Sequence, residues 1–219
     1  MLVDLWFDFH CPWCYIAETI LYQQLLQQPE DERPIIRFHT YLLHPELGEA
    51  SGQSFYEQVR RSHDLKDLDE AKAMMKDVLE AGQAVGLNFD FERLIHSSSR
   101  QAHRILKHLQ IRLCAQMGAR EASWKLLEYI HAVYRAYFEE GRDIQKRQTL
   151  GSILTQVLIQ EDAASMSSAD DQDLDALISL ETELIEAAGL EYIPHFLRED
   201  GQRLEGKVSA EKLKVFLGA

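Results

Sequence analysis

Two apolar runs separated by an amphipathic stretch open the chain. Residues 2–9 are mostly apolar and predict a buried strand. From about Pro12 the apolar residues recur with helical spacing, and residues 35–43 predict a second strand. Because a single helix joins them, the two strands should be parallel and the crossover right-handed.

After His44-Pro45 the apolar period becomes helical for roughly a hundred residues. Glycines follow three of the predicted helices, as expected for residues that end helices. The predicted helices are 74–85 before Gly86, 102–117 before Gly118, 124–138 before Gly141, and 150–158. The polar stretch 163–171 predicts a loop and a helix cap.

The C-terminal part returns to mixed structure. The predicted elements are a helix ending near Ala188 at Gly189, a strand at 192–198, a turn at 199–202, a return strand at 203–206 and a last helix capped by Ser209. The order is β-α-β, a helical block, then α-β-β-α. It predicts a thioredoxin-like α/β fold, with residues 1–43 and 169–219 as one domain and 44–168 as an inserted helical subdomain.

Two cysteines, Cys11 and Cys14, stand with two residues between them at the start of the first helix. Unpaired N–H groups and the helix dipole stabilise a thiolate there, so Cys11 is the expected nucleophile. Cys14, one turn further, is expected to resolve the mixed disulfide. Pro12 suits the first helical turn because its missing N–H costs nothing there.

Metal binding is the main alternative for this pair. A structural zinc site normally has four ligands, usually as two pairs, and here His10 is the only other nearby ligand. Haem attachment requires histidine directly after the second cysteine, where Tyr15 stands. Cys114 lies alone in a helical stretch and is expected to be a buried apolar residue, with a regulatory thiol as the alternative.

The composition of the chain restricts the classes of binding partner that we expect. Of the 219 residues 46% are hydrophobic, and the net charge of −13 argues against nucleic acid and against anionic membrane surfaces. The first residues carry no basic region, and no uncharged run is long enough to span a bilayer. A cytoplasmic protein is expected, and in a reducing cytosol a close cysteine pair favours redox catalysis or metal binding over a structural disulfide.

The motif Cys11-Pro12-Trp13-Cys14-Tyr15-Ile16 resembles the active-site signature of the DsbA-like thioredoxin-fold oxidoreductases, in particular their cytoplasmic FrnE-type branch. Residues 136–144 resemble a segment of that branch's helical insertion, and residues 193–196 stand where the family has its cis-proline loop. The resemblance covers essentially the whole chain. His195 departs from it, because an aromatic residue more usually follows the proline.

The resemblance implies a cis Ile193–Pro194 bond close to the Cys11 sulfur. Such a loop would let an extended substrate segment pair with the Ile193 backbone. Base rates for X–Pro bonds alone would favour a trans bond. Trp13 would offer an apolar contact to a substrate, or else shield Cys14.

Three ionisable side chains flank the motif. His10, if protonated, would favour the Cys11 thiolate, and the alternative is a solvent-exposed histidine without effect. A buried Asp4 or Asp8 would serve as a proton acceptor for Cys14, although at least one of the two is expected to face solvent.

The sequence therefore predicts a thiol–disulfide oxidoreductase that acts on protein, peptide or small-thiol substrates and needs no bound cofactor or metal. Glutathione is a candidate co-substrate. Two alternatives stay open: a glutathione-dependent enzyme like 2-hydroxychromene-2-carboxylate isomerase or kappa-class glutathione transferase, and a non-enzymatic chaperone or binding module. The isomerases and transferases typically carry serine where Cys11 stands. The sequence does not distinguish a monomer from a homodimer.

Overall fold

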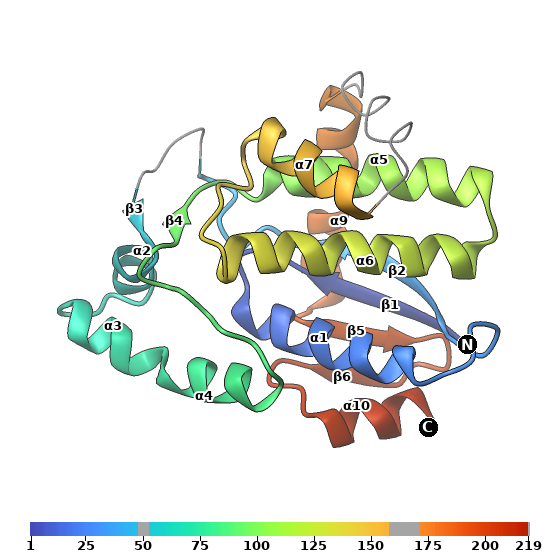
Figure 1. Cartoon of the computed structure of the whole chain (residues 1–219), viewed down its shortest axis with the longest axis horizontal. Helices are drawn as coiled ribbons and strands as arrows, with labels where there is room; N and C mark the ends of the chain where they lie inside the picture. Colours follow the sequence, from blue (N-terminus) through green and yellow to red (C-terminus); the bar gives the residue numbers. More distant parts are fainter. Residues whose placement is uncertain (48–52, 158–170, 219) are drawn as a thin grey trace.

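The centre of the molecule is a four-stranded mixed sheet with the order β2-β1-β5-β6 (Figure 1). The computed structural model describes residues 1–47, 53–157 and 171–218. The strands of this sheet are β1 Leu2–Phe7, β2 Ile35–Thr40, β5 His195–Arg198 and β6 Arg203–Glu205. β1 pairs parallel with β2, Leu2 opposite Ile35, and antiparallel with β5, Trp6 opposite His195. The predicted parallel β-α-β unit and mixed sheet are confirmed.

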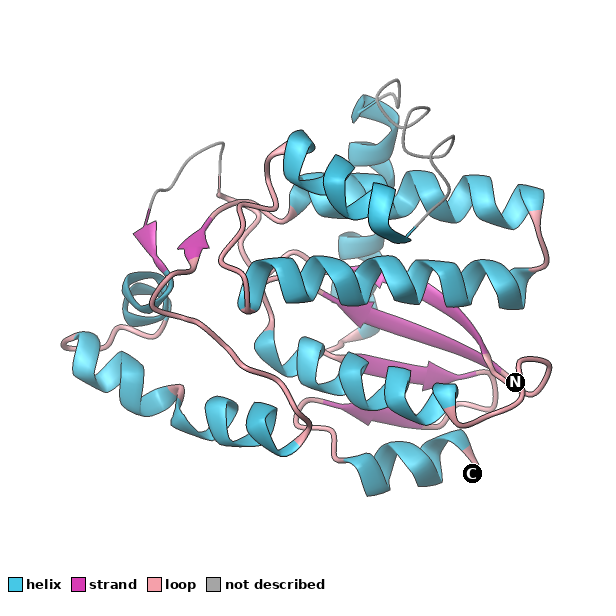
Figure 2. Ribbon diagram, in the orientation of Figure 1, coloured by secondary structure: helices cyan, strands magenta, loops and turns pink. Residues whose placement is uncertain are grey.

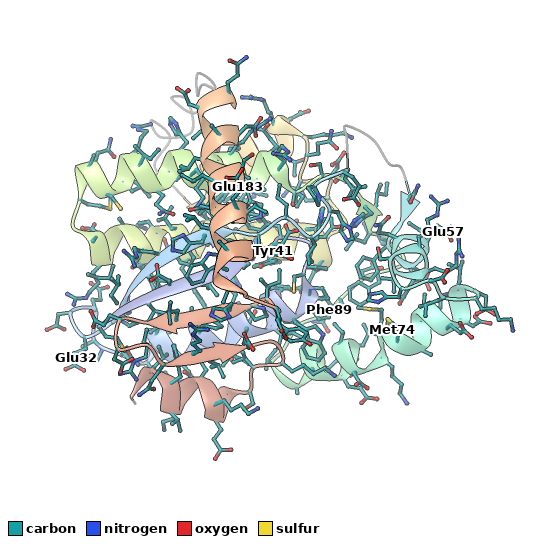
Figure 3. All side chains as sticks on the ribbon, turned by 180° about the vertical axis from the view of Figure 1, so that it is seen from behind. Glu32, Tyr41, Glu57, Met74, Phe89 and Glu183 are labelled. Atoms are coloured by element: carbon teal, nitrogen blue, oxygen red, sulfur yellow. The ribbon has the colours of Figure 1, made fainter. Side chains whose placement is uncertain are left out.

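Helices cover both faces of this sheet (Figure 2). α1, Pro12–Leu26, lies on one face, and α9, Asp171–Ala188, crosses the other, as the two opposite views show (Figures 1 and 3). The other helices in the described ranges are α2 Phe55–Ser62, α3 Leu68–Met74, α4 Lys76–Ala84, α5 Arg100–Gln116, α6 Ala119–Phe138, α7 Arg147–Val157 and α10 Ala210–Leu217. None of these described helices has the length and apolar character needed to cross a membrane.

The helical block differs from the prediction in two places. The helix expected over 74–85 is α4, which begins at Lys76, and the two helices before it, α2 and α3, are not predicted. Two unpredicted strands, β3 Gln53–Ser54 and β4 Ile95–His96, pair antiparallel. Strands of two residues carry no period that a sequence pattern could reveal. Most of the predicted loop at 163–171, and the domain boundary expected between 168 and 169, lie outside the described residues.

α1 is buried more widely than its predicted apolar face. Every residue from Cys14 to Leu21 is buried, including Glu18 and Thr19. The sheet covers one side of the helix, and α6 and α4 pack against it from the inserted block. The N-terminus of α1 therefore lies in a rigid setting, enclosed on several sides.

A buried ion-pair network attaches α9 to the sheet. Glu181 on α9 accepts hydrogen bonds from the Lys107 ammonium (2.7 Å) and the Thr40 backbone N–H (2.8 Å). Its other contact is the His39 ring, at 3.2 Å. Lys107 is 1% exposed, and it also donates to the Phe38 carbonyl. Although burial opposes ionisation, these partners lower the pKa of Glu181 to about 2.

We expect Glu181→Leu to destabilise the protein by about 3–5 kcal/mol, because it leaves the buried Lys107 charge without its carboxylate. Glu183→Leu is the matched control, since Glu183 is exposed on the same helix (Figure 3) and should change stability by about 0.5 kcal/mol or less. Urea unfolding at pH 7 measures both. Equal effects of the two substitutions would contradict the role given to Glu181.

Candidate active site

Cys11 is the N-cap residue of α1. Its backbone is extended (φ −88°, ψ 109°), and its N–H donates to the Asp8 carbonyl at 3.0 Å. Its Sγ accepts the backbone N–H of Cys14 at 3.2 Å, and Pro12 fills the first helical position. The Cys11 sulfur therefore lies where helix N–H groups can stabilise negative charge.

Cys14 lies beneath Cys11 and is 2% exposed. Burial raises its pKa well above the ordinary value, and the neighbouring Cys11 sulfur adds to that effect. Cys14 is therefore held as a neutral thiol. Cys11 is also buried, with 5% exposure, but it lines a pocket. The roles predicted for the two cysteines stay a prediction.

The loop before β5 lies against the Cys11 sulfur. The Ile193–Pro194 peptide bond is cis. The Cys11 thiol donates to the Ile193 carbonyl, with 3.9 Å between sulfur and oxygen. On the other side of the loop, the Gly206 N–H donates to the Pro194 carbonyl at 3.0 Å. Two distant parts of the chain thus meet at Cys11, and the turn at Gly206 holds the second of them.

A pocket of about 620 Å³, here called the Cys11 pocket, opens beside Cys11. Residues 10–13 form one wall, so Trp13 faces the pocket. The facing wall comes from α2 and from the junction of α3 with α4, which Met74 marks in Figure 3. Its apolar members are Phe55, Val59, Met74, Met75 and Val78. This volume is typical of small-molecule sites.

His10 is buried, with 4% exposure, so the alternative of a solvent-exposed ring is wrong. Its ring stacks near those of His96 and His44, with centroids 4.4 and 5.9 Å away, and its Nε2 donates to the Ser97 carbonyl at 2.5 Å. Burial lowers the pKa of His10 against the opposing effect of Asp8. A neutral imidazole at pH 7 removes the proposed attraction between a charged His10 and the Cys11 thiolate.

Four histidines line the pocket. His44, His63 and His96 join His10, and the His96 Nδ1 is 3.1 Å from the Tyr137 hydroxyl. Burial, together with His10 and His44, lowers the pKa of His96 to about 2. Within residues 1–47, 53–157 and 171–218, no group of three or more His, Cys, Asp or Glu is arranged to hold a metal ion.

Both aspartates near the motif are buried, so the expectation that at least one faces solvent is wrong. Asp4 pairs with Arg37 and His39 across β1 and β2. Asp8 accepts the Leu43 N–H at 2.7 Å and the His103 Nε2–H at 3.2 Å. Burial disfavours its charge, yet hydrogen bonds such as the one from His103 hold the pKa of Asp8 well below its usual range.

Sequence reasoning missed the parts of the site that come from the inserted block. His44 had a signal, because it follows the strand predicted to run parallel to the one that carries Cys11. The residues of α2 to α4 carried only the helical period. Cys114, expected to be buried, is exposed near the end of α5 and lies outside the Cys11 pocket.

Comparison with solved structures supports this fold. The chain is similar to a probable DsbA oxidoreductase from Streptomyces coelicolor, with a TM-score of 0.79, 19% identity, and coverage of 99% of this chain and 88% of the other. It is also similar to the cytosolic disulfide reductase DsbM from Pseudomonas aeruginosa (TM-score 0.61, 17% identity, 100% and 97% covered). A 2-hydroxychromene-2-carboxylate isomerase matches with a TM-score of 0.61, 16% identity, and 100% and 95% covered.

Comparison with curated protein sequences gives no match. The DSBA-like thioredoxin domain family, in contrast, matches residues 2–218, nearly the full length of the chain. The matched range includes the two cysteines, the inserted helices and the Ile193–Pro194 loop. The chain therefore belongs to the DSBA-like thioredoxin domain family.

Proposed function

We propose that this protein is a thiol–disulfide oxidoreductase whose redox centre is the Cys11–Cys14 pair. The observation that carries the proposal is the unequal setting of the two sulfurs. Both sulfurs are buried, but Cys11 caps α1 and lines the pocket, whereas Cys14 lies behind it, outside the pocket, with a raised pKa. A nucleophilic thiol in front of a resolving thiol is the arrangement that disulfide exchange requires.

The reaction follows from this arrangement in two steps. The Cys11 thiolate attacks one sulfur of a substrate disulfide, which forms a mixed disulfide and releases the other sulfur as a thiolate. Cys14 then loses its proton and attacks the Cys11 sulfur, which releases the second thiolate and closes the Cys11–Cys14 disulfide. The protein is oxidised by two electrons and the substrate is reduced. The reverse sequence donates a disulfide.

The surroundings of Cys11 support two further parts of the proposal. An extended substrate segment would pair with the backbone of Ile193, next to the nucleophile. Trp13 and the apolar wall of the Cys11 pocket would hold the group attached to the substrate sulfur. The similar DsbM is described as cytosolic, and one of its structures contains glutathione, which favours cytoplasmic action and small-thiol exchange for this chain too.

A glutathione-dependent isomerase is the second candidate function. The small-molecule size of the Cys11 pocket favours it, as does the likeness to the isomerase structure. The presence of a resolving cysteine favours the oxidoreductase, because isomerisation needs no second thiol.

Equilibration with reduced and oxidised glutathione tests the proposal. We expect one reversible two-electron couple, with a potential between roughly −270 and −120 mV, the span of thioredoxin-fold oxidoreductases. A value near the lower limit would indicate a reductase, and one near the upper limit a disulfide donor. Failure of Cys11 and Cys14 to form a disulfide in any glutathione buffer would reject the proposal.

A further inference from the structure

Lys207 lies at the mouth of the Cys11 pocket, and neither cysteine chemistry nor the fold requires it there. It follows β6 and precedes α10, and it lines the same pocket as Cys11 and Trp13. Its ammonium lies 4.8 Å from the centre of the Trp13 ring. Since Trp13 stands between the two cysteines, a group bonded to Cys11 extends into the neighbourhood of this charge.

The backbone holds Lys207 in this place. Gly206, directly before it, adopts a positive φ of 68° and donates its N–H to the Pro194 carbonyl at 3.0 Å. The turn that carries Lys207 is therefore fastened to the loop that contacts the Cys11 sulfur. The position of the lysine is set by the same hydrogen-bonded segment that borders the nucleophile.

Asp77, on α4, currently pairs with Lys207 across the pocket mouth, with 3.2 Å between Nζ and Oδ2. The two side chains are 65% and 72% exposed. An ion pair this exposed contributes little to stability, so another carboxylate can replace Asp77 at small cost. Among the described residues that line the pocket, Lys207 is the single lysine or arginine.

We infer that Lys207 selects disulfide substrates that carry a carboxylate close to the reacting sulfur, with an apolar chain between the two. The apolar part packs against Trp13 and the wall formed by Val59, Met75 and Val78, while the carboxylate takes the place of Asp77 on Lys207. This inference rests on the proposed function and names the substrate class of that same site.

The net charge of the whole chain opposes the binding of anionic substrates. The chain carries a net charge of −13, which by itself repels anionic substrates. A preference for an anionic disulfide must therefore come from a local cation. Its effect should weaken as ionic strength rises, because salt screens an exposed charge pair.

Single-turnover reduction of three small disulfides tests this. The probes are 3,3′-dithiodipropionic acid, which is anionic, 2-hydroxyethyl disulfide, which is neutral, and cystamine, which is cationic. Prereduced protein supplies both electrons, so each turnover converts one disulfide into two thiols and closes Cys11–Cys14. The readout is the ratio of the anionic to the neutral rate constant, which cancels effects on the intrinsic reactivity of Cys11.

Lys207→Met should lower this ratio by up to about fivefold, the upper range for an exposed charge pair. Lys207→Arg should keep the ratio within about 1.5-fold of the wild type, and Asp77→Asn should raise it by freeing the ammonium. Lys212→Met, an exposed lysine on α10 outside the pocket, makes the same change in net charge and should leave the ratio unaltered.

Failure of the proposed function and failure of the role given to Lys207 produce different results. If the wild type reduces none of the three disulfides, the proposed function falls and the inference falls with it. If the wild type reduces the neutral probe but Lys207→Met and Lys212→Met give the same anionic-to-neutral ratio, the oxidoreductase stands and the role of Lys207 is overturned.

Discussion

Replacing Cys11 by serine should abolish disulfide exchange, whereas replacing Cys14 should trap its intermediate. A hydroxyl cannot take part in thiol exchange, so Cys11→Ser should lower the exchange rate by roughly a thousandfold or more. Cys14→Ser keeps the nucleophile at the start of α1 but removes the resolving thiol. It should therefore accumulate a covalent adduct on Cys11 after incubation with oxidised glutathione, and added dithiothreitol should dissolve that adduct.

Intact-mass spectrometry of the variants measures both effects. Cys114→Ser is the control, because Cys114 is exposed on α5 and lies outside the Cys11 pocket. It should retain exchange activity and form no stable adduct through the redox pair. Retention of exchange by Cys11→Ser would refute the assignment of the nucleophile. Stoichiometric zinc that depends on both Cys11 and Cys14 would favour a metal site instead.

The fold could be predicted where a local pattern decides the structure. The run that forms β1 is buried on both faces, so it is apolar except for Asp4, and the helix after Cys11 begins where its N-cap and proline place it. The hairpin of β5 and β6 was predicted from Gly201, which adopts a positive φ of 87° in the turn. In each case the residues that specify the element are neighbours in sequence.

The inserted block was less predictable because its contacts are tertiary. The short helix α3 buries only Ala71, so it shows too little apolar period to be predicted, whereas the longer period around α4 was read correctly. The exposure of Cys114 could not be predicted for a related reason. Its place within α5 indicates helix, but only the packing of α5 decides which face is covered, and Cys114 lies on an exposed one.

The residues of the candidate site likewise fall into those that the sequence predicts and those that only the tertiary structure brings to the pocket. Cys11 and Cys14 are specified by their spacing and by the helix start, and Pro194 by its place before β5. His96 reaches the pocket from β4, a strand of two residues, and Lys207 from a turn after β6. No motif around either residue indicates in the sequence that it lies near Cys11. Their role follows only from the way the insertion and the C-terminal hairpin meet at the start of α1.

Acid should destabilise this protein at pH values where most folds lose little stability. Burial lowers the pKa of His10, His96 and His103, in the case of His96 to about 2. The unfolded chain protonates these histidines near pH 6.5, while the folded protein keeps them neutral. The unfolded state therefore binds more protons, and stability falls as the pH is lowered from about 6.5.

Two other histidines, whose pKa is raised in the folded protein, do not cancel this loss of stability. Burial works against their charge, but Asp4 and Glu181 raise the pKa of His39, and Glu18 raises that of His131. The stability from a raised pKa is fully present below the unfolded value and is lost only as the pH rises. Below pH 6.5 these two residues thus contribute no further change. The carboxylates with lowered pKa, Asp8 and Glu181, add to the loss only near pH 4.

Urea unfolding at pH 7, 6 and 5 measures the effect. Each buried neutral histidine contributes a slope of at most about 1.4 kcal/mol per pH unit below its unfolded pKa, so the free energy of unfolding should drop by several kcal/mol. His96→Gln should flatten the slope by about one proton, because it removes a histidine that burial keeps neutral in the folded protein. A free energy of unfolding that stays constant or rises between pH 7 and pH 5 would show that the imidazoles beside Cys11 accept protons in the folded state, and that they are not the neutral cluster described above.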